Sequence, residues 1–518
     1  MPIRSPYPEV SIPDTALTPF VFERATERGD NPAIIDGPSG RTLTYEQLFG
    51  AVKSFAGGLQ ARGFEKGDTL AILLPNLPEY AVAFHGTAWA GGTVTTVNPL
   101  YNAEEIRHQL DDAGAKFLIV FPQALENAKK AAEGTAVEEV FVLGEAEGAT
   151  PVTELLGEPL AEPVAVDPED TVALPYSSGT TGLPKGVMLS HRNLVANILQ
   201  ARSSLGMEED EVVIGVLPFF HIYGMTVIMN MGLHGGVTTV TMPRFDLEQF
   251  LSTIQEHKVT RAYVVPPIAL ALAKHPLVEK YDLSSLRLVL SGAAPLGAEL
   301  EQACQERLGC PVVQGYGMTE TSPVSHTAPM GEHKPGTIGP VLPNMECRIV
   351  DPEIGEDAAE GERGELWMRG PNIMKGYLNN DEATRETIVE DGWLRTGDVA
   401  VVDEDGYFAI VDRVKELIKY KGFQVAPAEL EGLLVEHPGV ADAAVIPLPD
   451  EEAGEIPKAF VVLADESTTT EEIQQFVADR VSSYKQIRAI EVVGEIPKSA
   501  SGKILRRVLR DREQAAAG

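Results

Sequence analysis

The sequence predicts an α/β fold, with a large N-terminal domain of helix-covered sheets over residues 1–414 and a small α+β domain over residues 415–518. The first observation is length, because 518 residues are enough for several domains of about 100–200 residues each. The second is composition, since 44% hydrophobic and 23% charged residues are typical of a soluble globular chain. The third is the order of the elements. Helical and strand-like patterns alternate in the first third, whereas short strands predominate after Asp398.

The alternation in the first third is regular. Apolar residues recur at helical spacing over residues 45–59 and 79–90, and short apolar runs that predict strands cover residues 69–74 and 116–121. Two further strands, at residues 287–291 and 311–315, each run directly into small residues. Ligands of open α/β sheets bind beyond the carboxyl ends of strands, so we expect these two turns to form walls of a site.

The last hundred residues have a different pattern. Short strands are predicted at residues 407–411, 441–446 and 459–463, with helices at residues 427–436 and 471–483. This order indicates a small α+β unit. Residues 144–170, rich in Glu, Pro, Ala and Gly, are predicted to be a surface connection.

Net charge and cysteine content exclude some classes of protein. With 42 basic and 76 acidic side chains the formal charge is −34, which disfavours sequence-independent nucleic-acid binding and electrostatic attachment to membranes. The uncharged residues 212–243 are interrupted by Pro218, His221 and several glycines, so a buried strand-turn-helix segment is expected there. The chain has three cysteines and no C-x-x-C pair, and its first residues show no signal-peptide pattern, so we expect a cytoplasmic location.

The string Y-S-S-G-T-T-G-L-P-K-G, residues 176–186, follows an apolar strand. Its three glycines let backbone N–H groups turn toward an anion, its four hydroxyls add donors, and Lys185 adds a positive charge. It is not the mononucleotide loop G-x-x-x-x-G-K-[ST], because Leu183 stands where the second glycine is required. The string predicts a phosphate-binding loop, and the alternative is a polar surface loop.

Six more strings share one resemblance. They are Q-G-Y-G-M-T-E at residues 314–320, G-W-L-R-T-G-D at 392–398, P-K-S-A-S-G-K at 497–503, P-F-F-H-I-Y-G at 218–224, S-G-A-A-P-L-G at 291–297 and K-E-L-I-K-Y-K-G-F-Q-V-A-P-A-E at 415–429. Together with the glycine-rich string, they resemble the adenylate-forming superfamily of acyl-CoA synthetases, with 4-coumarate:CoA ligases and fatty-acyl-CoA ligases closest. The resemblance implies two half-reactions, formation of acyl-AMP with release of pyrophosphate, then transfer of the acyl group to CoA with release of AMP.

The resemblance also implies an ATP site with Mg²⁺. Lys503 is similar to the family's catalytic lysine, Glu320 to the residue that holds Mg²⁺, Tyr316 to the residue that stacks on adenine, Asp398 to the ribose-binding aspartate and Arg413 to the arginine at ribose and phosphate. The remaining nucleotide-binding residues that it implies are Ser177, Ser178, Gly179, Thr180, Thr181, Lys185, Gln314, Gly315 and Thr319.

The other implied roles concern the acyl group and CoA. Lys415 matches the hinge about which the small domain rotates, Lys419 and Gln424 are expected to face the acyl-adenylate, and Lys421, Gly422 and Arg244 to contact CoA. His221 resembles the gate to the carboxylate. The acyl pocket is expected to be formed by Tyr223, Gly292, Ala293 and Ala294.

Several alternatives stay open at this point. The expected substrate is a hydroxycinnamate-like acid, but Leu290 and Val227 are apolar where plant hydroxycinnamate enzymes often carry polar residues, so a medium- or long-chain fatty acid is the alternative. A carrier protein could replace CoA, a luciferase-type oxygenase shares the scaffold, and a nucleotide sensor would keep the fold without turnover. The basic run from Lys498 to Arg512 could be a solvated tail. The sequence leaves the oligomeric state open.

Overall fold

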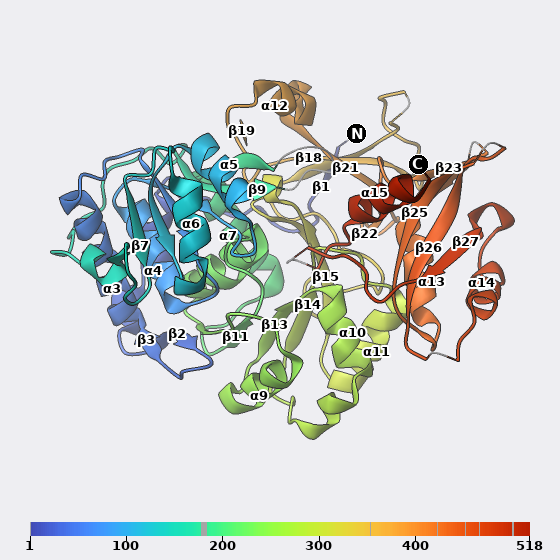
Figure 1. Ribbon diagram of the computed structural model, residues 1–518, viewed down its shortest axis with the longest axis horizontal. Helices are drawn as coiled ribbons and strands as arrows, with labels where there is room; N and C mark the ends of the chain where they lie inside the picture. The colour runs from blue at the N-terminus through green and yellow to red at the C-terminus, as the bar shows by residue number, and fades with distance from the viewer. Residues whose placement is uncertain are drawn as a thin grey trace.

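The computed structural model of the chain describes residues 2–177, 184–352, 354–421, 423–450, 452–465, 467–499 and 502–517. Within these residues the strands form four sheets, three in the N-terminal part and one in the C-terminal part (Figure 1). The fold predicted from sequence, large α/β layers followed by a small α+β unit, is confirmed.

The first sheet has a parallel centre covered by helices on both faces. Its strand order is β19-β10-β9-β5-β4-β6-β7-β8, and the alternating side chains of its central strands pack against α3 and α4 on one face and against α5 and α6 on the other. The strands are β4 (Thr69–Leu73), β5 (Thr93–Thr96), β6 (Ala115–Val120), β7 (Glu139–Val142), β8 (Thr150–Pro151), β9 (Thr171–Ser177), β10 (Lys185–Ser190) and β19 (Gly376–Tyr377), and the helices are α3 (Tyr45–Ala61), α4 (Pro78–Trp89), α5 (Ala103–Ala113) and α6 (Leu125–Ala132).

The second sheet carries the candidate site. Its order is β16-β15-β14-β13-β11-β12-β2-β3, and β11 to β15 run parallel. The strands are β2 (Pro32–Asp36), β3 (Thr42–Thr44), β11 (Val212–Gly215), β12 (Thr238–Thr241), β13 (Arg261–Val264), β14 (Leu288–Ser291), β15 (Val312–Gly317) and β16 (Val324–Thr327). The helices near it are α1 (Leu17–Val21), α2 (Ala25–Arg28), α7 (His191–Leu205), α8 (Met231–Gly235), α9 (Leu247–His257), α10 (Pro266–Lys274) and α11 (Ala298–Leu308).

The third sheet is antiparallel and lies between these layers and the C-terminal unit (Figure 1). Its pairing places Asp398 on β21 directly opposite Arg413 on β22. It consists of β1 (Ile3–Arg4), β17 (Glu346–Val350), β18 (Gly364–Arg369), β20 (Ile388–Val389), β21 (Trp393–Val402) and β22 (Phe408–Arg413), and α12 (Asp381–Thr387) precedes β20.

The C-terminal unit has its own hydrophobic core. Its sheet contains β23 (Ile418–Tyr420), β24 (Phe423–Val425), β25 (Val440–Asp450), β26 (Gly454–Leu463) and β27 (Ala489–Val492), with α13 (Pro427–Glu436), α14 (Thr470–Ala478) and α15 (Arg506–Ala517). The segment before α15 reaches across to the large part of the molecule (Figure 1). There Gly502, at a φ of +79°, approaches Val265, and a Cβ at Gly502 would lie 3.2 Å from the Val265 side chain.

Short helical turns complete the described elements. Seven are found within the described residues: η1 (Pro122–Ala124), η2 (Val152–Leu155), η3 (Tyr223–Asn230), η4 (Pro276–Lys280), η5 (Thr319–Thr321), η6 (Glu390–Gly392) and η7 (Ser483–Lys485). All are 3₁₀ turns except η3, which is a π-helix. Among the described helices, none is both long enough and apolar enough to cross a bilayer.

Three sequence predictions differ from the structure in detail. The helix predicted to reach residue 483 ends at Ala478, and the chain turns there so that Ile487 can join the core beside Val477. The strand predicted to end at residue 446 continues to Asp450. The connection at residues 144–170 is not only a surface segment, because Leu155 is fully buried and a Cβ at Gly58 of α3 would lie 1.9 Å from the Leu155 carbonyl oxygen.

Candidate active site

A cleft lies beyond the carboxyl ends of β14 and β15. The two strands are parallel neighbours, so the turns that follow them meet at one edge of the sheet, as open α/β sheets require of a ligand site. Both turns were predicted as site walls, and both line this cleft. The predicted site residues that line it are His221, Tyr223, Gly292, Ala293, Gly315, Tyr316, Thr319 and Lys503.

Lys503 enters the cleft from the C-terminal unit. Its ammonium group lies among apolar and aromatic walls, and burial, followed by the positive charge of Arg413, lowers its pKa below the ordinary value. The carboxylates of Asp398 and Glu320 act in the opposite direction. The structure thus gathers two cations and two anions from motifs that are far apart in the chain, and Lys503 is placed to meet an anionic ligand.

Asp398 is held between two of the predicted nucleotide-binding residues. The Tyr316 hydroxyl donates to Asp398 Oδ2 at 2.6 Å, and Arg413 Nε lies 3.1 Å from Asp398 Oδ1. Burial, together with this carboxylate, raises the pKa of Tyr316 far above its usual range. Each carboxylate oxygen still has a free lone pair after these contacts. The group therefore has the acceptor capacity that a pair of ribose hydroxyls needs.

Glu320 is buried in η5 and accepts two hydrogen bonds on one oxygen. Ser177 Oγ donates to Glu320 Oε1 at 3.2 Å, and the Tyr377 hydroxyl donates to the same atom at 2.8 Å. Both contacts converge on Oε1, which leaves Oε2 for another partner. A carboxylate oxygen is the ligand type that Mg²⁺ prefers, and Mg²⁺ commonly takes only one or two carboxylates beside phosphates and water. The donor set at Glu320 therefore fits Mg²⁺.

The predicted phosphate loop connects β9 to β10. These strands form an antiparallel hairpin in which Ser177 pairs with Lys185, and Lys185 Nζ lies 4.9 Å from the centre of the Tyr377 ring. Tyr377 therefore touches both the lysine of the loop and the carboxylate of Glu320. Ser178, Gly179, Thr180 and Thr181, the loop residues predicted to bind phosphate, lie outside the described residues.

The inner end of the cleft is aromatic and apolar. Tyr223 begins the π-helix η3 and donates its hydroxyl to the Leu290 carbonyl at 3.3 Å. A Cβ at Gly292 would lie 3.0 Å from the Tyr223 ring, so the glycine allows the ring to close this wall. Ala293 next to it adopts a φ of 72°, a conformation that costs a non-glycine residue about 1–3 kcal/mol and that is concentrated at ligand sites.

His221 stands at the mouth of this apolar end. The Tyr223 N–H donates to His221 Nδ1 at 3.3 Å, so the ring proton is assigned to Nε2. Burial and then the charge of Lys503 lower the pKa of His221 to about 3. The ring is therefore neutral at physiological pH, and its Nε2–H is a donor for an anionic oxygen.

Two predicted residues have a different position from the one expected. The Gln314 side chain points away from the cleft, because its amide bonds both backbone groups of Leu296 and Glu301 Oε2, all at 3.0 Å or less. It therefore holds the turn after β14 in place instead of contacting a ligand directly. Ala294 belongs to that turn but is not among the residues that line the cleft.

The predicted hinge and CoA-binding residues that the structure describes lie outside the cleft. Lys415 is exposed in the turn between β22 and β23, and Lys419 and Gln424 are exposed and pair with each other across the β23–β24 hairpin. Lys421 is exposed at the tip of this hairpin with a φ of 48°, and Gly422 lies outside the described residues. Arg244 is exposed just before α9. None of these described residues lines the cleft, and the roles of the whole set stay predictions.

The basic run near the C-terminus is not a solvated tail. Four of its side chains form ion pairs with acidic residues of the C-terminal unit and of the turn between β22 and β23. The pairs are Lys498 with Asp442, Arg506 with Glu431 and Arg510 with Glu416, each at 2.6 Å, and Arg512 with Glu491. These contacts fix the base of the segment that carries Lys503. The cysteines are buried as expected for small hydrophobic residues.

Sequence reasoning missed Tyr377 and Leu205. Tyr377 lies on β19, whose two residues carry no motif, and only its pairing with β10 brings it to Glu320. Leu205 ends α7 and lines the cleft, but an apolar residue at the end of an amphipathic helix looks like any core residue. Neither position had a signal that a single sequence could reveal.

Comparison with known proteins agrees with this geometry. The model of the family described as AMP-binding enzyme matches residues 21–378, and the model described as AMP-binding enzyme C-terminal domain matches residues 429–503. A 4-coumarate–CoA ligase of Petroselinum crispum is 46% identical over 98% of this chain and 96% of its own length. A 4-coumarate–CoA ligase of Pinus taeda is 45% identical over 98% of this chain and 97% of its own.

Solved structures share the whole fold. The crystal structure of an anthranilate CoA ligase in complex with anthranoyl-AMP has a TM-score of 0.92 and 29% identity, covering 98% of this chain and 99% of that one. ATP-bound MatB from Rhodopseudomonas palustris has a TM-score of 0.87 and 30% identity, covering 96% and 99% of the two chains. Both structures contain a nucleotide or an acyl-adenylate, which fits the chemistry of the groups around the cleft.

Proposed function

This chain belongs to the AMP-binding enzyme family and is an AMP-forming acid–thiol ligase of the 4-coumarate–CoA ligase type, and from that premise we propose that it joins a hydroxycinnamate-like aromatic acid to coenzyme A, with Mg²⁺ as the cofactor of ATP. The observation that carries the proposal is the position of Lys503. It shares one cleft with Tyr316, on the side of Asp398, and with Tyr223, at the apolar end. A nucleotide and an acyl group bound at these two places would meet beside its ammonium group.

The first half-reaction joins two anions. A substrate carboxylate oxygen attacks the α-phosphorus of ATP, the bond to the β-phosphate oxygen breaks, and pyrophosphate leaves. Two negative charges 4 Å apart repel by about 4 kcal/mol at an effective dielectric constant of 20, so a cation fixed beforehand at the point of contact lowers the barrier. Lys503 supplies that charge in our proposal, and the His221 Nε2–H orients the carboxylate.

The nucleotide is oriented by groups that the structure already holds in place. Asp398 accepts the ribose hydroxyls while Tyr316 and Arg413 fix its carboxylate. Ser177 and Lys185, at the two ends of the β9–β10 hairpin, face the triphosphate. Glu320 would hold Mg²⁺, which supplies positive charge to the departing pyrophosphate when bound.

The second half-reaction needs the CoA thiol at the acyl carbonyl. The thiol sulfur attacks that carbon, its proton is lost to solvent, and the bond to the AMP oxygen breaks. Lys503 occupies the cleft in this structure, and the hairpin with Lys419, Lys421 and Gln424 lies outside it. We propose that a rotation near Lys415 withdraws Lys503 and brings the hairpin to the adenylate. Large domain movements that reassemble a site between steps are common in enzymes.

The substrate is proposed from the apolar end of the cleft and from the relatives. Tyr223, Gly292 and Ala293 line this end, where the small residues leave the Tyr223 ring accessible for packing against an aromatic substrate. A medium- or long-chain fatty acid is the second candidate, because Val227 and Leu290, which also line the cleft, are apolar. A cytoplasmic location, where ATP and CoA are available, completes the proposal.

The test is a panel of acids with Mg-ATP and CoA. Cinnamate, 4-coumarate, ferulate and straight-chain acids from hexanoate to hexadecanoate are compared, with AMP and acyl-CoA measured separately by chromatography. We expect equal amounts of AMP and acyl-CoA, with the highest kcat/KM for a hydroxycinnamate. A profile led by straight-chain acids would favour the second candidate, and AMP without acyl-CoA would contradict the use of CoA.

A further inference from the structure

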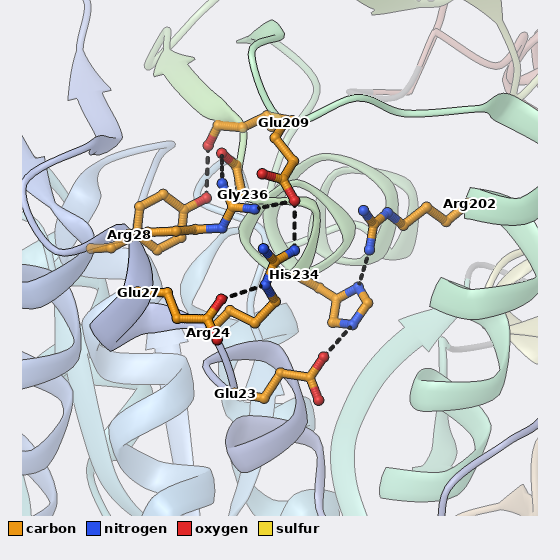
Figure 2. Close-up of polar contacts among 10 residues, drawn as sticks. Glu23, Arg24, Glu27, Arg28, Arg202, Glu209, His234 and Gly236 are labelled. Carbon is orange, nitrogen blue, oxygen red and sulfur yellow. Dashed lines mark hydrogen bonds and ion pairs between the residues drawn. The ribbon is translucent and has the colours of Figure 1, made fainter.

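An acidic segment after α7 is held by arginines from three other parts of the chain. Glu208 and Asp210 lie 3.5 and 3.4 Å from Arg287, and Glu209 Oε1 lies 2.5 Å from Arg24 and 2.7 Å from Arg28. Figure 2 shows Arg24 and Arg28 meeting at Glu209. We call residues 206–211, with the arginines that contact them, the arginine clamp. The pairs formed by Arg24 and Arg287 are exposed on both sides, so each contributes little by itself, whereas Arg28 is buried.

The inner part of the clamp is buried. Arg261 at the start of β13 is 0% exposed and forms an ion pair with Glu211, which is 2% exposed. Arg261 Nη1 donates to the Leu205 carbonyl at 2.9 Å, and Nη2 donates to the Gly206 carbonyl at 2.8 Å. The last carbonyls of a helix have no partner within the helix, and here a single guanidinium satisfies two of them. Arg261 therefore fixes the place where the chain leaves α7.

Leu205, the last residue of α7, belongs to the active-site cleft. The Leu205 side chain is 1% exposed and lines the apolar end of the cleft with Val227, Leu290 and Val324. These four residues are buried and apolar, and we call them the floor of the cleft. A shift of Leu205 would change the depth of the cleft without touching the nucleotide side.

Strand β13, which carries Arg261, also supports the wall of the cleft that Tyr223 forms. Side chains two residues apart on a strand share a face, so Tyr263 lies on the Arg261 face of β13. The Tyr263 ring packs against the Tyr223 ring with centroids 6.5 Å apart and an interplanar angle of 72°. Tyr223 lines the cleft. The two residues of β13 thus brace the floor and one wall.

We propose that Arg261 is a positioning residue for substrate choice: by holding Leu205 it keeps the floor shallow, so that the cleft takes a phenylpropenoate-sized acyl group and rejects long alkyl chains. The proposal rests on the proposed function. Burying an ion-paired arginine is costly, so a buried arginine is expected to make contacts that apolar side chains cannot make. The two carbonyl contacts give this buried arginine a task that apolar packing would not perform.

The experiment compares cinnamate with dodecanoate in four variants. Leu205→Ala deepens the floor directly. Arg261→Met combined with Glu211→Leu removes both buried charges, so that neither is left unpaired, and releases the two carbonyls. Arg261→Lys keeps the charge but loses the planar fork that reaches both carbonyls. Arg62→Met combined with Glu139→Leu is the matched control, because that pair, at 2.8 Å, is half-buried and does not contact the clamp.

We expect the wild type to prefer cinnamate. Because one methylene of space in a pocket changes selectivity by about tenfold or more, Leu205→Ala and the double variant should move the ratio of kcat/KM toward dodecanoate by about that factor. Arg261→Lys should lie between them and the wild type. The KM for ATP should be unchanged in all four variants, and the control should keep the wild-type ratio.

The results separate failure of this inference from failure of the function. If Leu205→Ala leaves the ratio of kcat/KM between dodecanoate and cinnamate unchanged, the role of Arg261 is overturned. The same holds if Leu205→Ala changes this ratio but both Arg261 variants keep the wild-type value. If the double variant does not fold, Arg261→Lys alone decides between the same two results. A wild type that prefers dodecanoate would also overturn it. Failure of the proposed function shows in the wild type itself, as a preference for dodecanoate or as no AMP from any acid, whereas failure of the Arg261 role alone shows only in the variants.

Discussion

Lys503 and His221 lie far apart in the sequence but line the same cleft, where burial and then the charge of Lys503 lower the pKa of His221 to about 3. The pair therefore presents one positive charge and one neutral N–H donor at the place where the carboxylate and the α-phosphate are proposed to meet. A protonated histidine beside the lysine would be repelled, so the neutral ring is the stable partner.

Glu320→Gln should raise the Mg²⁺ concentration needed for half-maximal activity. The substitution keeps the size of the side chain and removes the negative charge, and a lost charged contact is worth about 1.5–3 kcal/mol, or about tenfold or more in affinity. The measurement is the Mg²⁺ dependence of acyl-CoA formation at fixed ATP. Tyr377→Phe, which removes only the hydroxyl on Glu320 Oε1, should have a smaller effect. An equal Mg²⁺ dependence in Glu320→Gln and the wild type would contradict the assignment.

Asp398→Asn should weaken nucleotide binding. The buried carboxylate holds Tyr316 and Arg413 and is proposed to accept the ribose hydroxyls, so its neutral analogue loses charge-assisted bonds of about 1.5–3 kcal/mol. We expect the Kd for AMP, measured by calorimetry, to rise about tenfold or more while the KM for the acid changes little. Tyr316→Phe, which loses one hydrogen bond to this carboxylate, should have a Kd for AMP between those of the wild type and Asp398→Asn. Loss of acid binding with normal AMP binding would be the opposite of this expectation.

The fall in the kcat of adenylation at alkaline pH should reflect deprotonation of Lys503. Its pKa is lowered by burial first and by Arg413 second, and the charged form is the active one. The kcat of adenylation should therefore fall as pH rises through a value below 10.5. Asp398 raises this pKa, so Asp398→Asn at saturating ATP should move the fall to lower pH.

Lys503→Arg stays charged at every assay pH and provides the control. Any activity that it retains should not fall on the alkaline side. If its profile falls like that of the wild type, or if Asp398→Asn moves the fall to higher pH, Lys503 is not the group that titrates.

Acid should unfold the chain through its buried histidines. Burial lowers the pKa of His85 and of His326 to about 3, whereas an unfolded histidine titrates near 6.5. Below about pH 6.5 the unfolded state therefore binds more protons, and the free energy of unfolding falls as the pH falls toward 3. Each such histidine contributes about 1 kcal/mol per pH unit between pH 6 and 5.

His85→Gln and His326→Gln should each reduce this pH slope, and the two rings lie in different parts of the core, so the double variant should lose about twice as much. The free energy of unfolding in urea at pH 6 and pH 5 is the measurement. Slopes that match the wild type in both single variants would show that these rings are protonated in the folded state.

The segments with strong local patterns were predictable. Residues 427–436 form a helix at the predicted bounds, because Pro427 suits a first helical turn and the apolar spacing continues to Glu436. The carboxyl ends of β14 and β15 were predicted as site walls from their small residues, and both line the cleft. Local sequence carries this information because turns and strand ends have their own residue preferences.

Features that depend on distant contacts were not predictable from one sequence. The basic run looked like a solvated tail because its partners Glu416, Glu431 and Asp442 are 56 or more positions away. The contacts of Tyr377 with Glu320 and of Arg261 with Leu205 arise only from strand order and helix packing. Gln314 was predicted to bind the nucleotide, but its amide is used by Leu296 and Glu301, which no motif reveals.

The most direct test is carboxylate-dependent ATP–pyrophosphate exchange without CoA, measured beside thioester formation from preformed acyl-AMP and CoA. The wild type should perform both reactions. Lys503→Ala should lose exchange by a factor of about 10² to 10³, in line with removal of one charge-stabilising group, and should largely keep thioester formation. No exchange by the wild type with any acid, or equal loss of both reactions in Lys503→Ala, would contradict the claim that this lysine joins the acid and the triphosphate in one cleft.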